Sequence, residues 1–258
     1  MSNILAITDR ELKSYFASPI AWVAVGLFAL LVGGFYFAIL AYFIQASMQM
    51  EQMAAMGQSQ PLNINLALIG PLLQNVSVIV LFLLPMITMR TYSEEKRSGT
   101  IELLLTSPLT DFQIIMGKFL GAVVLYAIML LVTVVHLAIL FVYGQPEWKS
   151  IVSGYLGLLL MGAAFISVGL FISSTTKNQI VAGMLTFAVL LMLWIVNWFS
   201  DSAPPAVASV LRYLSITAHF DDFAKGIIDT THLAYYLSFI ALGLFLTIKS
   251  VDTERWRG

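Results

Sequence analysis

Long stretches without charge alternate along the chain with short stretches that hold most of its Lys, Arg, Asp and Glu residues. Each uncharged stretch is close to, or longer than, the roughly 20 residues that a helix needs to cross a bilayer. Polar and apolar positions do not alternate within them, as they would in the strands of a membrane barrel, so helices are expected. The pattern predicts six spans, near residues 20–44, 68–89, 116–142, 151–173, 179–199 and 233–249.

Composition supports this interpretation. Of the 258 residues, 59% are hydrophobic and 10% charged, and the mean hydropathy is +0.89, which a soluble domain could not keep in water. The expected fold is an all-α polytopic membrane protein, with residues 1–258 forming one transmembrane domain in the lipid bilayer. The chain has no cysteine, which excludes disulfides and thiolate metal sites. It has no basic stripe for nucleic acid.

The distribution of Lys and Arg predicts the orientation. Ten of the 13 fall in the amino-terminal segment, in the loops after the second and fourth predicted spans, and in the tail. By the positive-inside rule, both termini are expected in the cytoplasm, and the first span is expected to stay as an anchor. The ten are Arg10, Lys13, Arg90, Lys96, Arg97, Lys118, Lys177, Lys249, Arg255 and Arg257.

Residues 1–19 are expected to form a helix on the inner membrane surface. Apolar side chains recur along one stripe and charged side chains lie opposite, although Ile7 and Glu11 fit this pattern poorly. A solvated tail is the alternative. The Ser18-Pro19 step then breaks the helix and turns the chain into the bilayer. The apolar stripe comprises Ile4, Leu5, Leu12, Tyr15 and Phe16.

Between the second and third spans, residues 91–112 include the charged stretch EEKRSGTIELLLTSPLTD. Capping-box spacing occurs at Thr91–Glu94 and at Thr110–Gln113, and Gly99 can end a helix. These signals predict a compact cytoplasmic elbow that carries both signs of charge beside an apolar tip. Such a surface suits docking onto a soluble protein better than it suits a generic solvated loop.

Residues 200–232 form a second informative segment. Phe220, Phe223 and Ile227 share one helical face, and Asp221 with Lys225 has the spacing of an ion pair. A short helix that re-enters the membrane and a helix that rests on the outer leaflet are both compatible with this pattern. A metal site is disfavoured because the spacing of the His and Asp residues defines no coordination set. Those residues are His219, Asp221, Asp222, Asp229 and His232.

Within the predicted spans, His136 is the only imidazole, and without an acidic partner it is expected to pack rather than to relay protons. Gly117 and Gly121 have GxxxG spacing, which is typical of close helix contacts. The fourth span offers further small-residue surfaces at Gly154, Gly157, Gly162 and Gly169.

Three stretches resemble one family. They are EEKRSGTIELLLTSPLTDFQIIMGKFL (94–120), RELKSYFASPIAW (10–22) and HFDDFAKGIIDTTHLAYYLS (219–238). Together with the six spans, they resemble the ABC-2-type permeases of ATP-binding-cassette transporters, and most closely those of gliding-motility and copper-enzyme maturation systems. The resemblance implies a bacterial inner-membrane subunit that dimerises, or pairs with a related membrane subunit, over cytoplasmic ATPase subunits. An outer-side accessory protein is a further expected partner.

The resemblance also implies site residues. The elbow would be the coupling helix that seats in a groove of the ATPase, and the outer segment would cap the exit. Lys96 and Ser98 are expected to vary. The implied coupling residues are Glu94, Glu95, Arg97, Gly99, Thr100, Glu102, Leu103, Leu104, Leu105 and Pro108. The implied outer gate residues are Phe220, Asp221, Asp222, Phe223, Gly226 and Asp229.

The sequence contains no GxxxxGK[ST] motif, so ATP and Mg are expected on the partner, and no cofactor, metal or catalytic residue is expected in this chain. An autonomous ion-coupled transporter is the alternative, but the predicted spans hold no acidic residue and no repeat is evident. An intramembrane protease would need HExxH or a nucleophile with a general base, and neither occurs at membrane depth.

Overall fold

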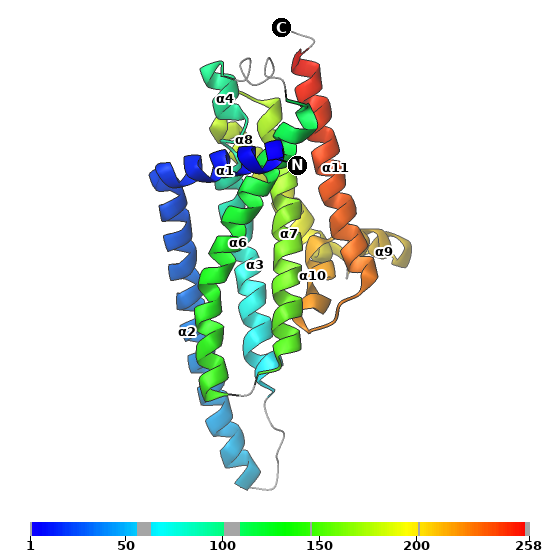
Figure 1. Cartoon of the computed structure of the whole chain (residues 1–258). Helices are drawn as coiled ribbons and strands as arrows, with labels where there is room; N and C mark the ends of the chain where they lie inside the picture. The colour runs from blue at the N-terminus through cyan, green and yellow to red at the C-terminus, as the bar shows by residue number, and fades with distance from the viewer. Residues whose placement is uncertain (1, 56–62, 101–108, 145, 201, 256–258) are drawn as a thin grey trace.

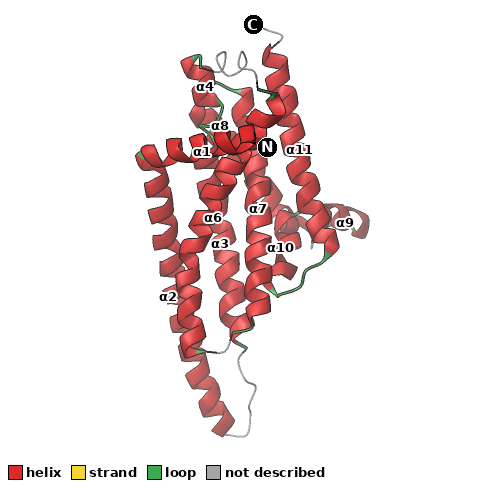
Figure 2. Cartoon of the chain, in the orientation of Figure 1, coloured by secondary structure: helices red, strands yellow, loops and turns green. Residues whose placement is uncertain are grey.

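The computed structural model describes residues 2–55, 63–100, 109–144, 146–200 and 202–255. In these ranges all regular structure is helical (Figure 2). Among the described residues, six helical segments are long and apolar enough to cross a membrane, and each contains one of the six predicted spans, so the expected all-α membrane fold is confirmed. The elements are α1 (Ser2–Ala17), α2 (Pro19–Ala55), the short π-helix η1 (Asn65–Ile69), α3 (Gly70–Thr88), α4 (Ser93–Ser98), α6 (Asp111–Tyr143), α7 (Trp148–Thr175), α8 (Gln179–Ser200), α9 (Pro205–Leu214), α10 (Ile216–Ala224) and α11 (Thr230–Arg255).

Several helix boundaries follow from local sequence. α1 ends at Ala17 and α2 begins at Pro19, whose missing N–H costs nothing in the first turn of a helix. The predicted break at Ser18-Pro19 is therefore confirmed. α2 continues well past the predicted end of the first span at residue 44, because the following Gln, Ala, Met and Glu residues favour helix. Its far end extends beyond α6 (Figure 1).

α7 is the central helix of the bundle, and it contacts α3, α6, α8, α10 and α11. Its glycines allow these approaches. A Cβ at Gly154 would collide with Leu73 of α3, one at Gly162 with Tyr126 of α6, and one at Gly169 with Thr88 of α3. The small-residue surfaces predicted on the fourth span are thus confirmed as helix contacts.

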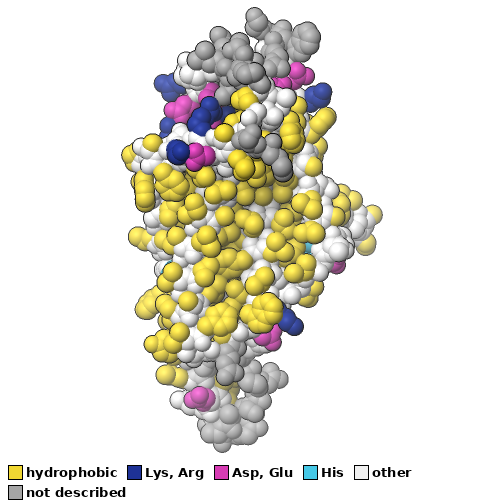
Figure 3. Space-filling model, in the orientation of Figure 1, with side chains coloured by type: hydrophobic (Ala, Val, Ile, Leu, Met, Phe, Trp, Pro, Cys, Tyr) yellow, Lys and Arg dark blue, Asp and Glu magenta, His cyan; other side chains and the backbone are white. Residues whose placement is uncertain are grey.

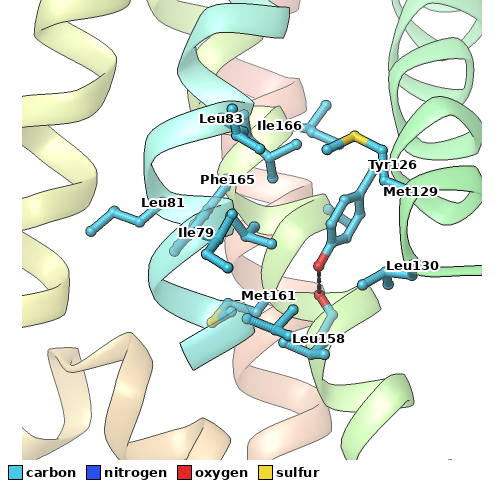
Figure 4. Close-up of a cluster of buried hydrophobic side chains, with 14 of the residues drawn as sticks. Ile79, Leu81, Leu83, Tyr126, Met129, Leu130, Leu158, Met161, Phe165 and Ile166 are labelled. Carbon is cyan, nitrogen blue, oxygen red and sulfur yellow. Dashed lines mark hydrogen bonds between the residues drawn. The ribbon is translucent and has the colours of Figure 1, made fainter. Parts of the chain in front are cut away.

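The core between α3, α6 and α7 is largely apolar, and Tyr126 forms a buried polar contact within it. The Tyr126 hydroxyl donates a hydrogen bond of 2.9 Å to the Leu158 carbonyl, as the dashed line in Figure 4 shows. Fully buried Met129, Met161 and Phe165 surround this pair. Lipid offers no hydrogen-bond partner, so a hydroxyl left without one would cost roughly several kcal/mol of free energy. The bond inside the bundle avoids this cost.

His136 of α6 packs against α2. Its ring lies 5.0 Å from that of Tyr36, and its Nε2 would be 3.3 Å from a Cβ placed on Gly33. No acidic side chain contacts it in the described part of the chain. These contacts support the interpretation of His136 as a packing residue.

Charge is concentrated at one end of the bundle. Figure 3 shows a broad yellow belt of hydrophobic side chains and, above it, a cluster of blue and magenta ones near α1 and α4. α1 lies across this end of the bundle (Figure 1). α9 packs on α8, and α10 packs on α7, where Phe220 and Phe223 approach Gly157. Gly157 is nine residues into α7, so α10 penetrates roughly 14 Å along it.

Candidate coupling site at the charged end

The turn between α3 and α4 is fastened to α7 by one hydroxyl. The Ser173 Oγ accepts hydrogen bonds of 3.1 Å from the backbone N–H groups of Tyr92 and Ser93, and it donates one of 3.0 Å to the Met89 carbonyl. Ser173, Tyr92 and Ser93 are fully buried. The start of α4 is therefore bonded directly to the end of α7.

This arrangement corrects the predicted capping box at Thr91–Glu94. α4 begins at Ser93, and its N-cap residue Tyr92 makes no side-chain cap, because the N–H groups there are satisfied by the distant Ser173 and by the preceding helical turn. The Glu94 carboxylate instead accepts two hydrogen bonds, of 2.8 and 3.0 Å, from Arg90 on the protein surface.

Gly99 ends α4 in the left-handed conformation, with φ of +73°. Nothing lies within 4 Å of the position of its missing Cβ, so the backbone conformation alone favours glycine here. The predicted second capping box is confirmed, since Thr110 and Gln113 exchange hydrogen bonds of 3.3 Å at the start of α6. Five predicted coupling residues lie outside the described residues: Glu102, Leu103, Leu104, Leu105 and Pro108.

Lys118 joins three segments in the interior of this end. It lies on α6 with a side chain only 1% exposed, although the sequence interpretation counted it as a loop cation. Its Nζ lies 2.6 Å from Glu95 of the elbow, 3.1 Å from Glu11 of α1 and 3.2 Å from the Thr91 carbonyl. These contacts use all three N–H donors of the ammonium group. The Tyr92 ring lies 5.1 Å away and covers the group.

Arg10 completes the cluster. Its guanidinium lies 2.9 Å from Glu11 and 4.0 Å from Glu95, so two cations face two carboxylates. Burial by itself raises the pKa of Glu11, but Lys118 and Arg10 outweigh this effect and hold the pKa below its ordinary value. We name these four residues, Arg10, Glu11, Glu95 and Lys118, the hub.

The two glycines of the GxxxG pair on α6 lie where α6 contacts α1. A Cβ on Gly117 would lie 2.5 Å from that of Ile7, and one on Gly121 would lie 2.9 Å from that of Glu11. Ile7 and Glu11, which fit the predicted membrane stripe poorly, therefore face α6. Leu5 of that stripe is 65% exposed. Leu12, Tyr15 and Phe16 of the stripe pack against the core, so much of the predicted stripe faces protein, and the contact of α1 with the membrane surface stays a prediction.

A second ion pair ties α4 to the last helix. Lys96, expected to vary, has a side chain 3% exposed and lies 2.7 Å from Glu254 of α11. Within the predicted coupling set, Glu95 faces Lys118. The other described members are exposed: Glu94, Arg97, Gly99 and Thr100. The described part of the elbow around α4 thus presents one side to solvent and binds α1, α6, α7 and α11 with the other.

A recess of about 560 Å³ lies between α1, the elbow and α6. Both signs of charge line it, from Arg10 and Glu11 on one wall to Arg90 and Glu94 on the other. A recess of this size at the charged end can receive side chains of a partner protein.

The residues of the predicted outer gate have different surroundings in the structure. Phe220 and Phe223 are buried against α7, and Asp221 contacts Gln74 of α3 at 3.5 Å. Gly226 has φ of +90° and packs on Ser150. Exposed Asp229 accepts a 2.7 Å hydrogen bond from the Thr231 N–H. Ile227, predicted on the same helical face as Phe220 and Phe223, is 54% exposed and lies beyond α10, which ends at Ala224.

The two remaining histidines pair with one another. His219 Nδ1 lies 2.7 Å from His232 Nδ1, and His232 Nε2 lies 2.8 Å from Asp222. Burial lowers the pKa of His219, an effect that the Tyr213 carbonyl opposes. Among the described residues, no three His, Asp or Glu side chains gather as metal ligands.

Fold and site together define a multi-pass helical membrane protein with an ion-paired elbow at one end. The model of the ABC-2 family transporter proteins matches residues 5–248, so the chain belongs to this family. The family and the six apolar helices make the chain a multi-pass protein of the inner membrane. ABC-2 permeases work with a cytoplasmic ATPase subunit in ABC transporters.

Curated relatives support the family assignment. The chain is 27% identical over 143 residues to the probable multidrug ABC transporter permease YbhR of Escherichia coli (strain K12), covering 55% of this chain and 38% of YbhR. It is 32% identical over 139 residues to the inner membrane transport permease YhhJ of the same organism, covering 52% of this chain and 36% of YhhJ. The chain thus matches little more than a third of the length of either relative.

Proposed function

We propose that this chain is the permease subunit of an ABC exporter and that its elbow transmits the movements of a separate ATPase to the spans. Family membership supports the class of protein. The way the elbow is held supports the role. Through Lys118, Ser173 and Lys96 it is joined to α6, α7 and α11, so a force applied to its exposed side reaches three spans at once.

The hub extends this connection to α1. Because Lys118 binds Glu11 and Glu95 together, separating α1 from the elbow would break one of the two ion pairs of a buried ammonium group. Coupling requires only that the ATPase contact the elbow differently in its two states. Closure of the ATPase would then shift the elbow and α1 as one unit.

In this proposal, ATP and Mg bind to the partner, and a second copy or a related membrane subunit completes the membrane unit. The work is export, or force transmitted to an outer-side accessory protein. Resemblance of the amino-terminal and 219–238 stretches to gliding-motility and copper-enzyme maturation permeases favours a system of that kind. α9 and α10 would form the gate on the exit side, with Phe220 and Phe223 as its packed face.

The test changes only exposed elbow charges. The E94K/R97E variant, expressed with its cognate ATPase and purified through a tag on the permease, should lose most of the co-purified ATPase and keep the melting temperature of the native permease. Glu95 is left intact, because lysine there would face Lys118 and disturb the fold. D9K/K13E is the matched control, since it inverts an exposed ion pair on α1 at the same end of the molecule.

Two outcomes oppose the proposal. Full recovery of the ATPase with E94K/R97E would mean that the ATPase docks on another surface. An equal loss of co-purified ATPase in D9K/K13E would indicate a general effect of charge. A native permease that carries no ATPase at all would favour an autonomous transporter.

A further inference from the structure

A second cavity lies at the opposite end of the bundle from the hub. It has a volume of about 340 Å³ and lies between α3, α8 and α10. This volume is within the range of small-molecule sites. Polar and aromatic side chains line it together, including Asn75 and Ser77 of α3, Trp194 and Trp198 of α8, and Asp221 of α10. We name it the α3–α8–α10 groove.

Three polar side chains of the groove donate hydrogen bonds to the backbone. The Asn75 amide donates 2.8 Å to a main-chain carbonyl of α3, and the Ser77 hydroxyl donates 2.7 Å to another. The Thr217 hydroxyl donates 3.3 Å to a carbonyl of α8. Their oxygens can still accept, while the second N–H of the Asn75 amide and the buried Trp194 indole N–H, which has no hydrogen-bond partner, remain as donors. The groove thus offers both donors and acceptors, and the feature that favours a cation is the Asp221 carboxylate.

Asp221 is the one charged residue that lines the groove in the described part of the chain. Gln74 contacts its carboxylate at 3.5 Å, and no ion pair joins it to Lys225, which is exposed one turn further on. Burial raises the pKa of Asp221, an effect that Lys225 and Gln74 oppose. The carboxylate thus lies in a partly dry environment without a direct counter-ion, and a bound cation would supply one.

Two indoles form an aromatic wall. The Trp194 and Trp198 rings meet edge to face, with centroids 5.5 Å apart. Trp198 is 67% exposed on the outside of α8, and neighbouring Phe199 is 62% exposed. The wall is therefore continuous with the apolar surface of the bundle, from which a lipophilic molecule can approach. Tryptophan faces attract organic cations through their quadrupole.

We propose that the α3–α8–α10 groove binds a lipophilic organic cation, with Asp221 as its counter-ion and Trp194 and Trp198 as its aromatic wall. The site goes beyond the proposed function, and only its role as an exit-side cargo site rests on that function. Binding requires no ATPase, so the two proposals can fail separately.

The test measures tetraphenylphosphonium binding by equilibrium dialysis against nanodiscs that contain the full-length permease, with empty nanodiscs subtracted. Tetraphenylborate is the matched probe, since it has a similar shape and the opposite charge. Asp221→Asn should weaken tetraphenylphosphonium binding about tenfold, as expected for loss of one charged partner. Trp198→Leu should weaken it several-fold. Glu147→Gln and Trp148→Leu are the controls, because both side chains are exposed near the start of α7 and outside the groove.

Selective loss of tetraphenylphosphonium binding in Asp221→Asn and Trp198→Leu would support the proposal. Three results would overturn it: no binding above empty nanodiscs, undiminished binding in both groove variants, or equal binding of tetraphenylborate. Melting temperatures of all variants separate lost binding from lost folding. If Asp221→Asn unfolds, the folded Trp198→Leu variant and the probe pair still decide the question.

Discussion

Lys118 and Glu95 face one another at 2.6 Å, although they belong to different helices and the lysine side chain is only 1% exposed. Taking these charges out of water is costly, and the cost is offset only while both partners are present. Lys118 also binds Glu11, so one ammonium group holds the elbow and α1 together. The hub is thus a connection whose loss has consequences for both stability and coupling.

Lys118→Met should destabilise the permease by roughly 3–5 kcal/mol, because Glu11 and Glu95 would be left with Arg10 as their only cation. Chemical unfolding in mixed micelles measures this free energy. Lys13→Met is the control, since Lys13 forms an exposed pair with Asp9 that should contribute at most about 1 kcal/mol. Similar losses in the two variants would show that the hub adds nothing beyond a surface ion pair.

Gly117→Ala should push α1 away from α6, because the new Cβ would lie 2.5 Å from the Cβ of Ile7. Overpacking of this kind costs about 1–3 kcal/mol. Limited proteolysis should cut α1 faster in this variant, and the melting temperature should fall. Gly26→Ala provides the comparison, since no atom lies within 4 Å of that position. An unchanged rate of cleavage in Gly117→Ala would mean that α1 does not depend on this contact.

Gly99→Ala isolates a conformational effect. The position has φ of +73° and open space around it, so the alanine methyl group meets no neighbour and only the backbone is strained. A cost of about 1–2 kcal/mol is expected, and Gly99→Asn should cost less because asparagine tolerates the left-handed region better. Thermal unfolding ranks the three proteins. Equal melting temperatures for alanine and asparagine would indicate that the end of α4 relaxes into another conformation.

The sequence was sufficient for the architecture because hydropathy and helix signals are local. Six uncharged stretches predicted six spans, Ser18-Pro19 predicted the break after α1, and Thr110 with Gln113 predicted the start of α6. Each of these signals depends on residues that are close together in the chain. The orientation in the membrane stays a prediction.

The hub could not be predicted in the same way, because its partners are far apart in the sequence. Lys118 lies 107 positions from Glu11, and Ser173 lies 80 positions from Ser93. One signal was present: an ionisable residue within a predicted span, such as Lys118, is a candidate functional residue by default. The capping box predicted at Thr91–Glu94 was wrong for the same reason, because the distant Ser173 binds backbone N–H groups that a local cap would have bound.

Acidification should weaken the hub, and the sign follows from Glu11. Its pKa is lower in the folded protein than its ordinary value of 4.5, because Lys118 and Arg10 outweigh the effect of burial. The stabilisation is therefore complete above the ordinary value and is lost as the pH falls through the folded value. The melting temperature of the native permease should decline below about pH 4.5 more steeply than that of Glu11→Gln. Glu51→Gln, which changes an exposed carboxylate near the end of α2, should keep the native steepness. Parallel pH profiles for the native protein and Glu11→Gln would show that the ion pairs of Glu11 do not stabilise the fold.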